Sequence, residues 1–230
     1  MFSKYEDSAY SLKEAVLGDY LFSYDASEPY IRISRTSDPK SVIFQTLASW
    51  PFVTAGYATE SRAPIVDGNY KANEWTLYET PYQSIKSVFI VENKILFRGE
   101  VFGLVTRASY DLTFSVLESK QIKFELEVTP ILGTVNRVFL NYWCDVRESF
   151  HGFGVQYTYW NLKGRRIPVM VAEQGIGRGA QPITSFLNLI ADGTGGDWAT
   201  TYAPKPLYLT SHNRSVVFEN TEVHLYFNTK

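Results

Sequence analysis

The sequence predicts an all-β fold, an antiparallel β-sandwich with long loops and one or two short helices. Between residues 30 and 127, short runs of Val, Ile, Phe, Tyr and Thr alternate with turn-like segments such as TSDPK, VDGN, VENK and LESKQ, the pattern of strands and turns. The segment KQIKFELEV alternates apolar and charged residues, as a strand with one buried and one solvent-exposed face does. No long segment has a helical period, so strands at regular spacing favour a sandwich.

The individual elements follow in chain order. SLKEAVL at residues 11–17 and ITSFLNLIA at 183–191 are the two helix candidates. SVFIVENKILFRGEV predicts two strands joined at Glu92 to Lys94. RVFLNYWC predicts a strand that places Val138, Leu140, Tyr142 and Cys144 on one side.

The later part of the chain has a different amino-acid composition. Residues 150–206 are dense in Gly, Pro, Asn and aromatic residues, and we expect two long loops there, of the kind that often carries function. SVVFEN and EVHLYFN predict the last two strands. Because no linker or repeat interrupts the sequence, we expect one domain over residues 1–230.

Composition narrows the classes of function. The chain has 230 residues, 45% of them hydrophobic, and a formal net charge of -2. It lacks the basic excess with which proteins attract nucleic acid or anionic membranes, so a neutral or small partner is expected. The lone Cys144 lies in an apolar run and predicts a buried structural thiol. Residues 1–12 lack the features of a secretory signal and no apolar run approaches the ~20 residues of a membrane span, so a cytoplasmic location is expected.

The segment EQGIGRGA contains Gly175, Gly177 and Ala180 at the spacing of a dinucleotide fingerprint. A phosphate cradle is disfavoured, because the charge of Glu173 would face the phosphate oxygens. The short helix candidate that follows leads to DGTGGD rather than to a second parallel strand. The loop therefore needs another explanation.

The segment WCDVRE resembles the W-x-D-x-x-E nucleophile motif of retaining α-glycosidases and points to Asp145. That chemistry requires a second carboxylic acid about 5 Å away and a barrel that usually takes about 250 residues, more than this chain offers. We therefore predict that Asp145 is an exposed carboxylate at a strand end.

The histidines His151, His212 and His224 form no metal-binding motif with cysteine or carboxylate residues. No metal site and no cofactor are expected. An acid and base pair of His151 or His212 with Glu173, as in sugar epimerases built on a sandwich, stays open as an alternative to surface histidines.

Three segments carry a family resemblance that is strongest over residues 120–220. FHGFGVQYTYWNLKGRRIPVMVAEQGIGRGAQPIT, the preceding strands from KQIKFELEV to RVFLNYWCDVRESFHGFG, and GGDWATTYAPKPLYLTSHNRSVVFEN resemble the N-terminal β-sandwich of glycoside hydrolase family 31, especially its sulfoquinovosidase-like and α-glucosidase-like members. One position departs from the family pattern, since Val155 stands where Gly-Glu-Gln has its glutamate. Any polar role of that glutamate is therefore in doubt in this chain.

The resemblance implies a sandwich of the galactose-mutarotase type that precedes a catalytic (β/α)8 barrel. It implies a non-catalytic accessory domain that supports the barrel, in cis or in trans, and sends a loop toward the sugar site. On that basis the chain alone is expected to be inactive. The candidate carbohydrate-binding residues are Glu173, Gln174, Arg178, Gln156, Trp160 and Trp198.

Two alternatives belong to other classes of function. The chain can be a stand-alone carbohydrate-binding module with a stacking platform of Tyr157, Tyr159, Trp160 and Trp198, which would bind an α-linked sugar. It can also be a purely structural or interaction protein. A face that would cover a barrel is apolar, so some self-association is expected if that face is exposed.

Overall fold

The computed structural model of the chain describes residues 3–5, 12–48, 50–64, 70–118, 120–155, 158–172, 174–191, 193–219 and 226–227. The chain divides into two compact units. The first consists of Met1–Thr59 and Glu74–Trp143, and the second of Glu60–Asn73 and Cys144–Lys230. That all 230 residues act as one domain stays a prediction.

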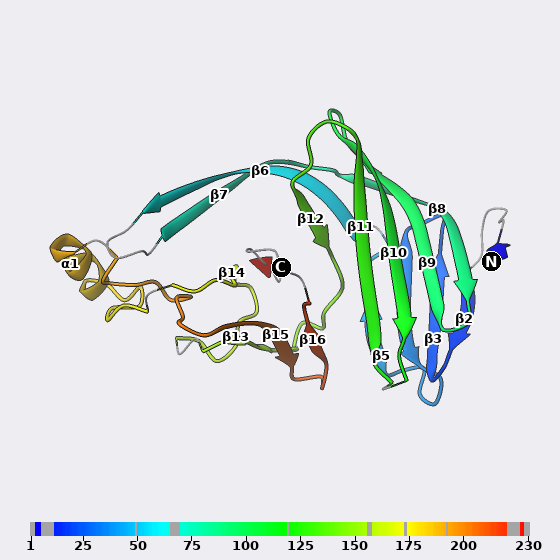
Figure 1. Ribbon diagram of the computed structural model, residues 1–230. Helices are drawn as coiled ribbons and strands as arrows, with labels where there is room; N and C mark the ends of the chain where they lie inside the picture. Colours follow the sequence, from blue (N-terminus) through cyan, green and yellow to red (C-terminus); the bar gives the residue numbers. More distant parts are fainter. Residues whose placement is uncertain are drawn as a thin grey trace. The chain divides into compact units, whose positions relative to one another are not determined.

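The first unit is built around two antiparallel sheets that pack face to face (Figure 1). The five-stranded sheet has the order β1-β8-β9-β10-β11. Its strands are β1 (Ser3–Tyr5), β8 (Tyr82–Val91), β9 (Lys94–Phe102), β10 (Arg107–Val116) and β11 (Ile122–Leu132). The four-stranded sheet consists of β2 (Lys13–Leu17), β3 (Tyr20–Asp25), β4 (Tyr30–Arg35) and β5 (Val42–Gln45). The prediction of an antiparallel all-β sandwich is confirmed.

Aromatic side chains from both sheets fill the core of this sandwich. Phe114 is 1% exposed, and its ring lies 5.9 Å from that of Phe22 on the facing sheet. Tyr24 and Phe97 make a similar edge contact across the layers, with ring centroids 5.5 Å apart. Large β-branched and aromatic residues suit the pleated surface and interdigitate there.

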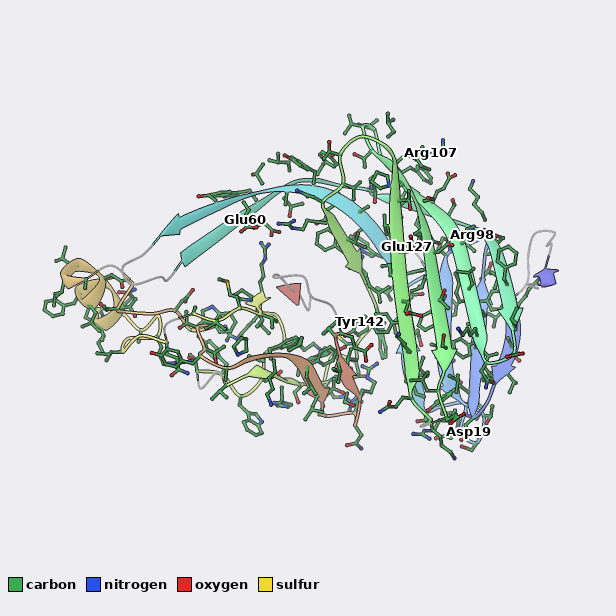
Figure 2. All side chains as sticks on the ribbon, in the orientation of Figure 1. Asp19, Glu60, Arg98, Arg107, Glu127 and Tyr142 are labelled. Carbon is green, nitrogen blue, oxygen red and sulfur yellow. The ribbon has the colours of Figure 1, made fainter. Side chains whose placement is uncertain are left out.

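Strand β11 follows the predicted alternation. Its apolar residues Ile122, Phe124, Leu126 and Val128 pack against the core, and the charged residues between them are exposed. The outer face of the five-stranded sheet is charged, as Figure 2 shows for Arg98, Arg107 and Glu127. Arg98 pairs with Asp111 at 2.6 Å, and Arg107 pairs with Glu100 at 2.6 Å.

The first helix candidate, residues 11–17, is wrong. Residues Lys13–Leu17 form strand β2, which pairs with β3. Ala15 and Leu17 face the core while Glu14 and Val16 are exposed. The period of two, together with pairing to a neighbouring strand, therefore overrides a helix propensity too weak for so short a segment.

A third sheet has the order β12-β6-β7. Its strands are β6 (Val53–Pro64), β7 (Tyr70–Glu79) and β12 (Arg137–Leu140). The predicted strand RVFLNYWC is thus only half formed, because β12 ends at Leu140. Cys144 is a free, half-buried thiol beyond that strand, so it is less buried than predicted.

The second unit contains a small sheet, a two-stranded pair and one helix. The sheet has the order β13-β15-β16, and β14 pairs with β17. The elements are β13 (Phe150–Gly154), β14 (Ile167–Pro168), α1 (Ile183–Ile190), β15 (Pro204–Thr210), β16 (Ser215–Val217) and β17 (Tyr226–Phe227). The second helix candidate is confirmed as α1, and long loops join the elements of this unit (Figure 1).

Tyr208 is the centre of the small core of this unit. It is 2% exposed, and the rings of Phe150, Phe153 and Phe218 lie 5.8, 5.6 and 6.1 Å from its own. Burial raises the pKa of the Tyr208 hydroxyl. The segment FHGFG is an irregular strand whose register with β15 shifts between Gly152 and Gly154.

Among the described residues, none of the helical segments has the length and apolar character needed to cross a bilayer.

Candidate functional site

The loop of residues 174–179 runs alongside residues 194–196. The backbone N–H of Ile176 donates to the carbonyl of Thr194 at 3.1 Å, and that of Arg178 donates to the carbonyl of Gly195 at 2.7 Å. Thr200 Oγ1 donates to the carbonyl of Gln174 at 3.0 Å. The loop is therefore an ordered part of the second unit, held mainly through backbone groups.

The glycines of this loop serve backbone packing. A Cβ on Gly175 would lie 2.2 Å from the backbone N of Gly196, and one on Gly177 would lie 2.3 Å from Thr184 Oγ1. Gly175 also has a φ of +64°, which L side chains rarely adopt. The space that a phosphate cradle would need next to Gly175 and Gly177 is occupied by protein atoms. The glycine spacing of this loop is therefore explained by close packing of the backbone.

Arg178 joins three segments of the second unit. Its Nε donates to Thr158 Oγ1 at 3.3 Å, and one terminal nitrogen donates to the carbonyl of Thr200 at 3.3 Å. Its backbone is in the left-handed region, with a φ of +47°. Arg178 is half-buried, so it links the loop to the segments before β14 and β15.

The three described aromatic residues of the predicted platform, Tyr159, Trp160 and Trp198, take part in two separate ring contacts. Trp198 meets Tyr159 edge to face, with ring centroids 5.6 Å apart and planes at 64°. The guanidinium of Arg165 lies 3.3 Å from the Tyr159 ring centre and 5.4 Å from that of Trp198. Such a stack of a cation on two rings stabilises the loops that carry it.

Trp160 belongs to a different contact. Its side chain is 86% exposed, and its ring lies 5.0 Å from that of His151. His151 Nδ1 is 2.6 Å from the carbonyl of Trp160, and its Nε2 is 3.0 Å from Ser149 Oγ. β13 ends at Gly154, so Tyr159 and Trp160 lie in a loop.

Four of the six predicted site residues are described, and they fall into two groups. Gln174, Arg178 and Trp198 belong to the loops around residues 174–200, whereas Trp160 belongs to the His151 contact. Glu173 and Gln156, like Tyr157 and His224, lie outside the described residues. The carbohydrate-binding role of these residues stays a prediction.

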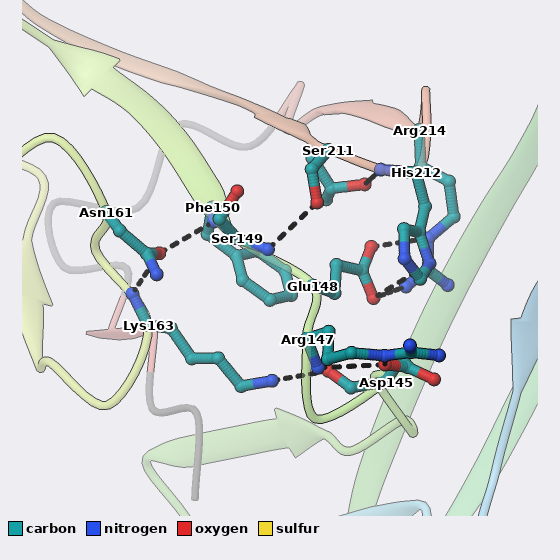
Figure 3. Close-up of polar contacts among 11 residues, drawn as sticks. Asp145, Arg147, Glu148, Ser149, Phe150, Asn161, Lys163, Ser211, His212 and Arg214 are labelled. Atoms are coloured by element: carbon teal, nitrogen blue, oxygen red, sulfur yellow. Dashed lines mark hydrogen bonds and ion pairs between the residues drawn. The ribbon is translucent and has the colours of Figure 1, made fainter.

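The carboxylate of Asp145 caps a turn. Its Oδ1 accepts the backbone N–H of Arg147 at 2.8 Å, and this hydrogen bond is the main cause that lowers the pKa of the Asp145 carboxyl. Lys163 Nζ donates to the carbonyl of Asp145 in the same turn (Figure 3). Asp145 lies between β12 and β13 and its side chain is 27% exposed, so it is neither on a barrel strand nor as exposed as predicted.

Glu148, the last residue of the same motif, is part of a buried ion pair. Its side chain is 0% exposed, and Arg214 Nε donates to its Oε1 at 3.0 Å while a second Arg214 nitrogen donates to Oε2 (Figure 3). Burial raises the pKa of the Glu148 carboxyl, but hydrogen bonds from Arg214 and Thr210 outweigh that effect and leave the pKa below its ordinary value. In this chain, the aspartate of the W-x-D-x-x-E segment caps a turn, and its glutamate forms a structural ion pair.

His212 lies beside this ion pair, with its Nδ1 3.9 Å from Glu148 Oε2. The sequence pattern did not reveal Arg214 or Arg165, because the contacts of Arg214 with Glu148 and of Arg165 with Trp198 join residues distant in sequence. Asn161 and Ser211 complete the cluster by accepting the backbone N–H groups of Phe150 and Ser149, each at 3.0 Å. Among the described residues, no group of His, Cys, Asp and Glu is arranged to hold a metal ion.

Val155 occupies the position at which the resembled family has a glutamate. Its side chain is 39% exposed, and its backbone N–H donates to the carbonyl of Ala203 at 3.3 Å. Gly154 before it has a φ of +107°. The backbone course of this segment is therefore set by the glycine and the pairing with residue 203, with no contribution from a polar side chain at 155.

No protein-family model matches the chain. Two curated relatives are sulfoquinovosidases. The one from Agrobacterium fabrum is 26% identical over 138 residues, which are 58% of this chain and 20% of the relative. The one from Escherichia coli is 29% identical over 99 residues, which are 43% of this chain and 15% of the relative.

A solved structure extends the likeness to nearly the whole chain. A GH31 family sulfoquinovosidase from E. rectale, solved in complex with the aza-sugar inhibitor IFGSQ, matches with a TM-score of 0.58 and 18% identity. The match covers 94% of this chain and 30% of that one, so the two share a fold. The resemblance to glycoside hydrolase family 31 is thereby confirmed, and the chain is a domain related to the sulfoquinovosidases of that family.

Proposed function

We propose that this chain is a non-catalytic accessory sandwich of a family 31 α-glycosidase, one that supports the catalytic barrel and contributes the loop of residues 174–179 near the sugar site. The observation that carries the proposal is the extent of the structural match, since 94% of the chain corresponds to only 30% of a sulfoquinovosidase. The remaining part of such an enzyme would supply the catalytic barrel and both reacting carboxylates.

The state of the two motif carboxylates supports the same proposal. A retaining glycosidase needs two carboxyl groups about 5 to 5.5 Å apart on either side of the scissile bond. Asp145 is used as a turn cap, and Glu148 is buried against Arg214. Neither carboxylate is presented to a substrate, and neither is suited to act as nucleophile or acid.

Within this proposal, Gln174 and Arg178 are the candidate polar contacts of the loop. Their backbones are fixed by hydrogen bonds to Thr200 and Gly195, so their positions are preorganised before a sugar binds. An amide and a guanidinium suit sugar hydroxyls or an anionic substituent, and sulfoquinovosides carry a sulfonate. The substrate class proposed for the assembled enzyme is therefore an α-linked, anionic sugar.

Turnover measurements test the proposal. The chain alone is expected to release no aryl alcohol from an aryl α-glucoside or an aryl α-sulfoquinovoside. The Asp145→Asn variant is the matched control, because it keeps the size of the side chain and removes its charge. Release of sugar by the chain, lost in Asp145→Asn, would contradict the proposal and restore Asp145 as a nucleophile.

The second candidate function, a stand-alone carbohydrate-binding module, is favoured by one observation. Trp160 is 86% exposed, as a stacking residue would be. Titration with α-linked sugars followed by tryptophan fluorescence tests it. Saturable quenching that Trp160→Ala abolishes would support this alternative over the accessory domain.

A further inference from the structure

Helix α1 packs on the second unit through its polar side. Thr184 is 7% exposed, and its Oγ1 accepts the backbone N–H of Gly179 at 2.9 Å. Asn188, one turn later, accepts the backbone N–H of Gly195 at 2.8 Å through Oδ1. The glycines at 177 and 195 let the backbone approach Thr184 closely, since a Cβ on either would overlap atoms of that residue. Hydrogen bonds and glycine contacts thus hold the inner face of the helix.

The apolar side of α1 faces outward. The side chains of Ile183, Phe186, Leu189 and Ile190 are 51%, 63%, 84% and 67% exposed. At about 100° per residue, these four side chains share one side of the helix, opposite Thr184 and Asn188. We call these four residues the apolar stripe.

This orientation is the reverse of the usual one, in which the apolar side of a surface helix faces the core. A helix of eight residues is too short to be stable on its own, so α1 depends on its contacts. Contiguous exposed apolar surface usually marks an interaction site. The segment ITSFLNLI contains no charged residue, so the stripe fits an apolar protein surface and not an anionic ligand.

We propose that the apolar stripe of α1 is the surface on which the catalytic barrel of a family 31 enzyme docks. This inference rests on the proposed function and names the contact through which that function would operate. The barrel is the occupant because the chain corresponds to 30% of a sulfoquinovosidase chain, which leaves the larger part of such an enzyme to cover the stripe. A second copy of this chain is the alternative occupant, and the crosslinking experiment below distinguishes it from a barrel.

Docking of a barrel on α1 would also affect the loop of residues 174–179, because α1 contacts that loop directly. Thr184 Oγ1 binds the loop at Gly179, and a Cβ on Gly177 would overlap Thr184. A barrel that covers the apolar stripe would therefore also fix the position of Gln174 and Arg178. The stripe would act as a positioning surface for that loop.

Photocrosslinking in the whole protein, as its native cell makes it, tests the inference. Phe186 is replaced by p-benzoylphenylalanine, and Leu104, a fully exposed residue of the first unit, is replaced in the same way as the control. The expected result is a crosslink at position 186, but not at 104, to a peptide of a family 31 catalytic barrel on the same chain or on a bound one. Peptide sequencing by mass spectrometry identifies the partner.

Three results would overturn the docking surface: a crosslink from 186 to a second copy of residues 1–230, a crosslink to an unrelated protein, or no crosslink above that at 104. If a barrel is present in the preparation but 186 does not react with it, only the docking surface is wrong. If no barrel accompanies the chain, the proposed function fails as well.

A double variant provides an independent measurement. Phe186→Ser with Ile190→Ser should weaken association between the chain and its barrel by about tenfold or more for each side chain, whereas Leu104→Ser should leave it unchanged. An unchanged affinity in the double variant, with circular dichroism matching the parent chain, would contradict the inference.

Discussion

Different kinds of interaction stabilise the interior of each of the two units. In the first unit, two sheets bury a continuous set of large side chains such as Phe22, Phe97 and Phe114. In the second, the structure depends on the Glu148–Arg214 ion pair, on glycines packed against backbone, and on side chains that bind carbonyl groups. A core of apolar residues tolerates surface variation, whereas a unit built from specific polar contacts is sensitive to single atoms. The loops of the second unit are therefore held by specific polar and backbone contacts and not by a large core.

The largest effect is expected in the core of the first unit. Phe114→Ala should lower the free energy of unfolding by about 3–5 kcal/mol, because Phe114 is 1% exposed and its ring lies within 5.5 to 6.5 Å of four other aromatic rings. Urea denaturation followed by circular dichroism measures the change. Phe102→Ala, at the partly exposed end of the same sheet, is the control and should cost clearly less. Equal losses in the two variants would show that the sandwich core is not the main source of stability.

Removal of the charge of Glu148 should have the next largest effect. Glu148→Gln leaves Arg214 without its buried counter-charge, and breaking such a pair costs about 3 kcal/mol or more. Thermal unfolding at pH 7 measures the loss, with Glu125→Gln on the exposed face of β11 as a matched control. A loss no greater than in Glu125→Gln would contradict the structural role of the pair.

The ion pair also predicts the response to acid. The pKa of the Glu148 carboxyl is lowered in the folded protein, so the folded state binds its proton less readily than the unfolded state. The resulting stabilisation is fully present above the unfolded pKa, near 4.3, and is lost as the pH falls through the lower folded value. Glu148→Gln should flatten the dependence of stability on pH below about 4.5, while Glu125→Gln keeps it. An unchanged acid slope in Glu148→Gln would contradict this assignment.

A smaller and more local effect is expected at Gly177. An alanine there would place its Cβ 2.3 Å from Thr184 Oγ1 and 2.6 Å from the backbone N of Thr184, and overpacking of this kind costs about 1–3 kcal/mol. Hydrogen exchange at the amides of Ile176 and Arg178, which donate to the carbonyls of Thr194 and Gly195, should accelerate by about tenfold for each 1.4 kcal/mol. Gly103→Ala is the control, since its Cβ would meet Pro81 Cδ at 3.1 Å and Thr80 Cα at 3.8 Å, a milder overlap than at Gly177. Unchanged protection in Gly177→Ala would mean that the loop is not held as the structure has it.

The same contrast explains how far the sequence predicts the structure. In β11, alternation of Phe124 and Leu126 with charged residues reports directly which side faces the core, so strand and orientation follow from the pattern. In the second unit, the decisive contacts join residues distant in sequence, such as Glu148 with Arg214 and Arg165 with Trp198. Pair contacts of this kind leave no periodic signal. The family resemblance over residues 120–220 predicts a candidate functional region, but only the structure separates the contacts of Trp160 from those of Trp198.

Replacement of the two tryptophans is expected to change stability least, and the difference between the two variants distinguishes a packed ring from an exposed one. Trp198 lies under Arg165 and against Tyr159, so Trp198→Ala should cost about 1–2 kcal/mol through lost ring and cation contacts. Trp160 is 86% exposed, and Trp160→Ala should change stability by less than about 0.5 kcal/mol. Thermal unfolding of the two variants in parallel measures the difference. A large loss for Trp160 would place it in the packing of the second unit, and would leave the sugar-binding alternative without its exposed stacking residue.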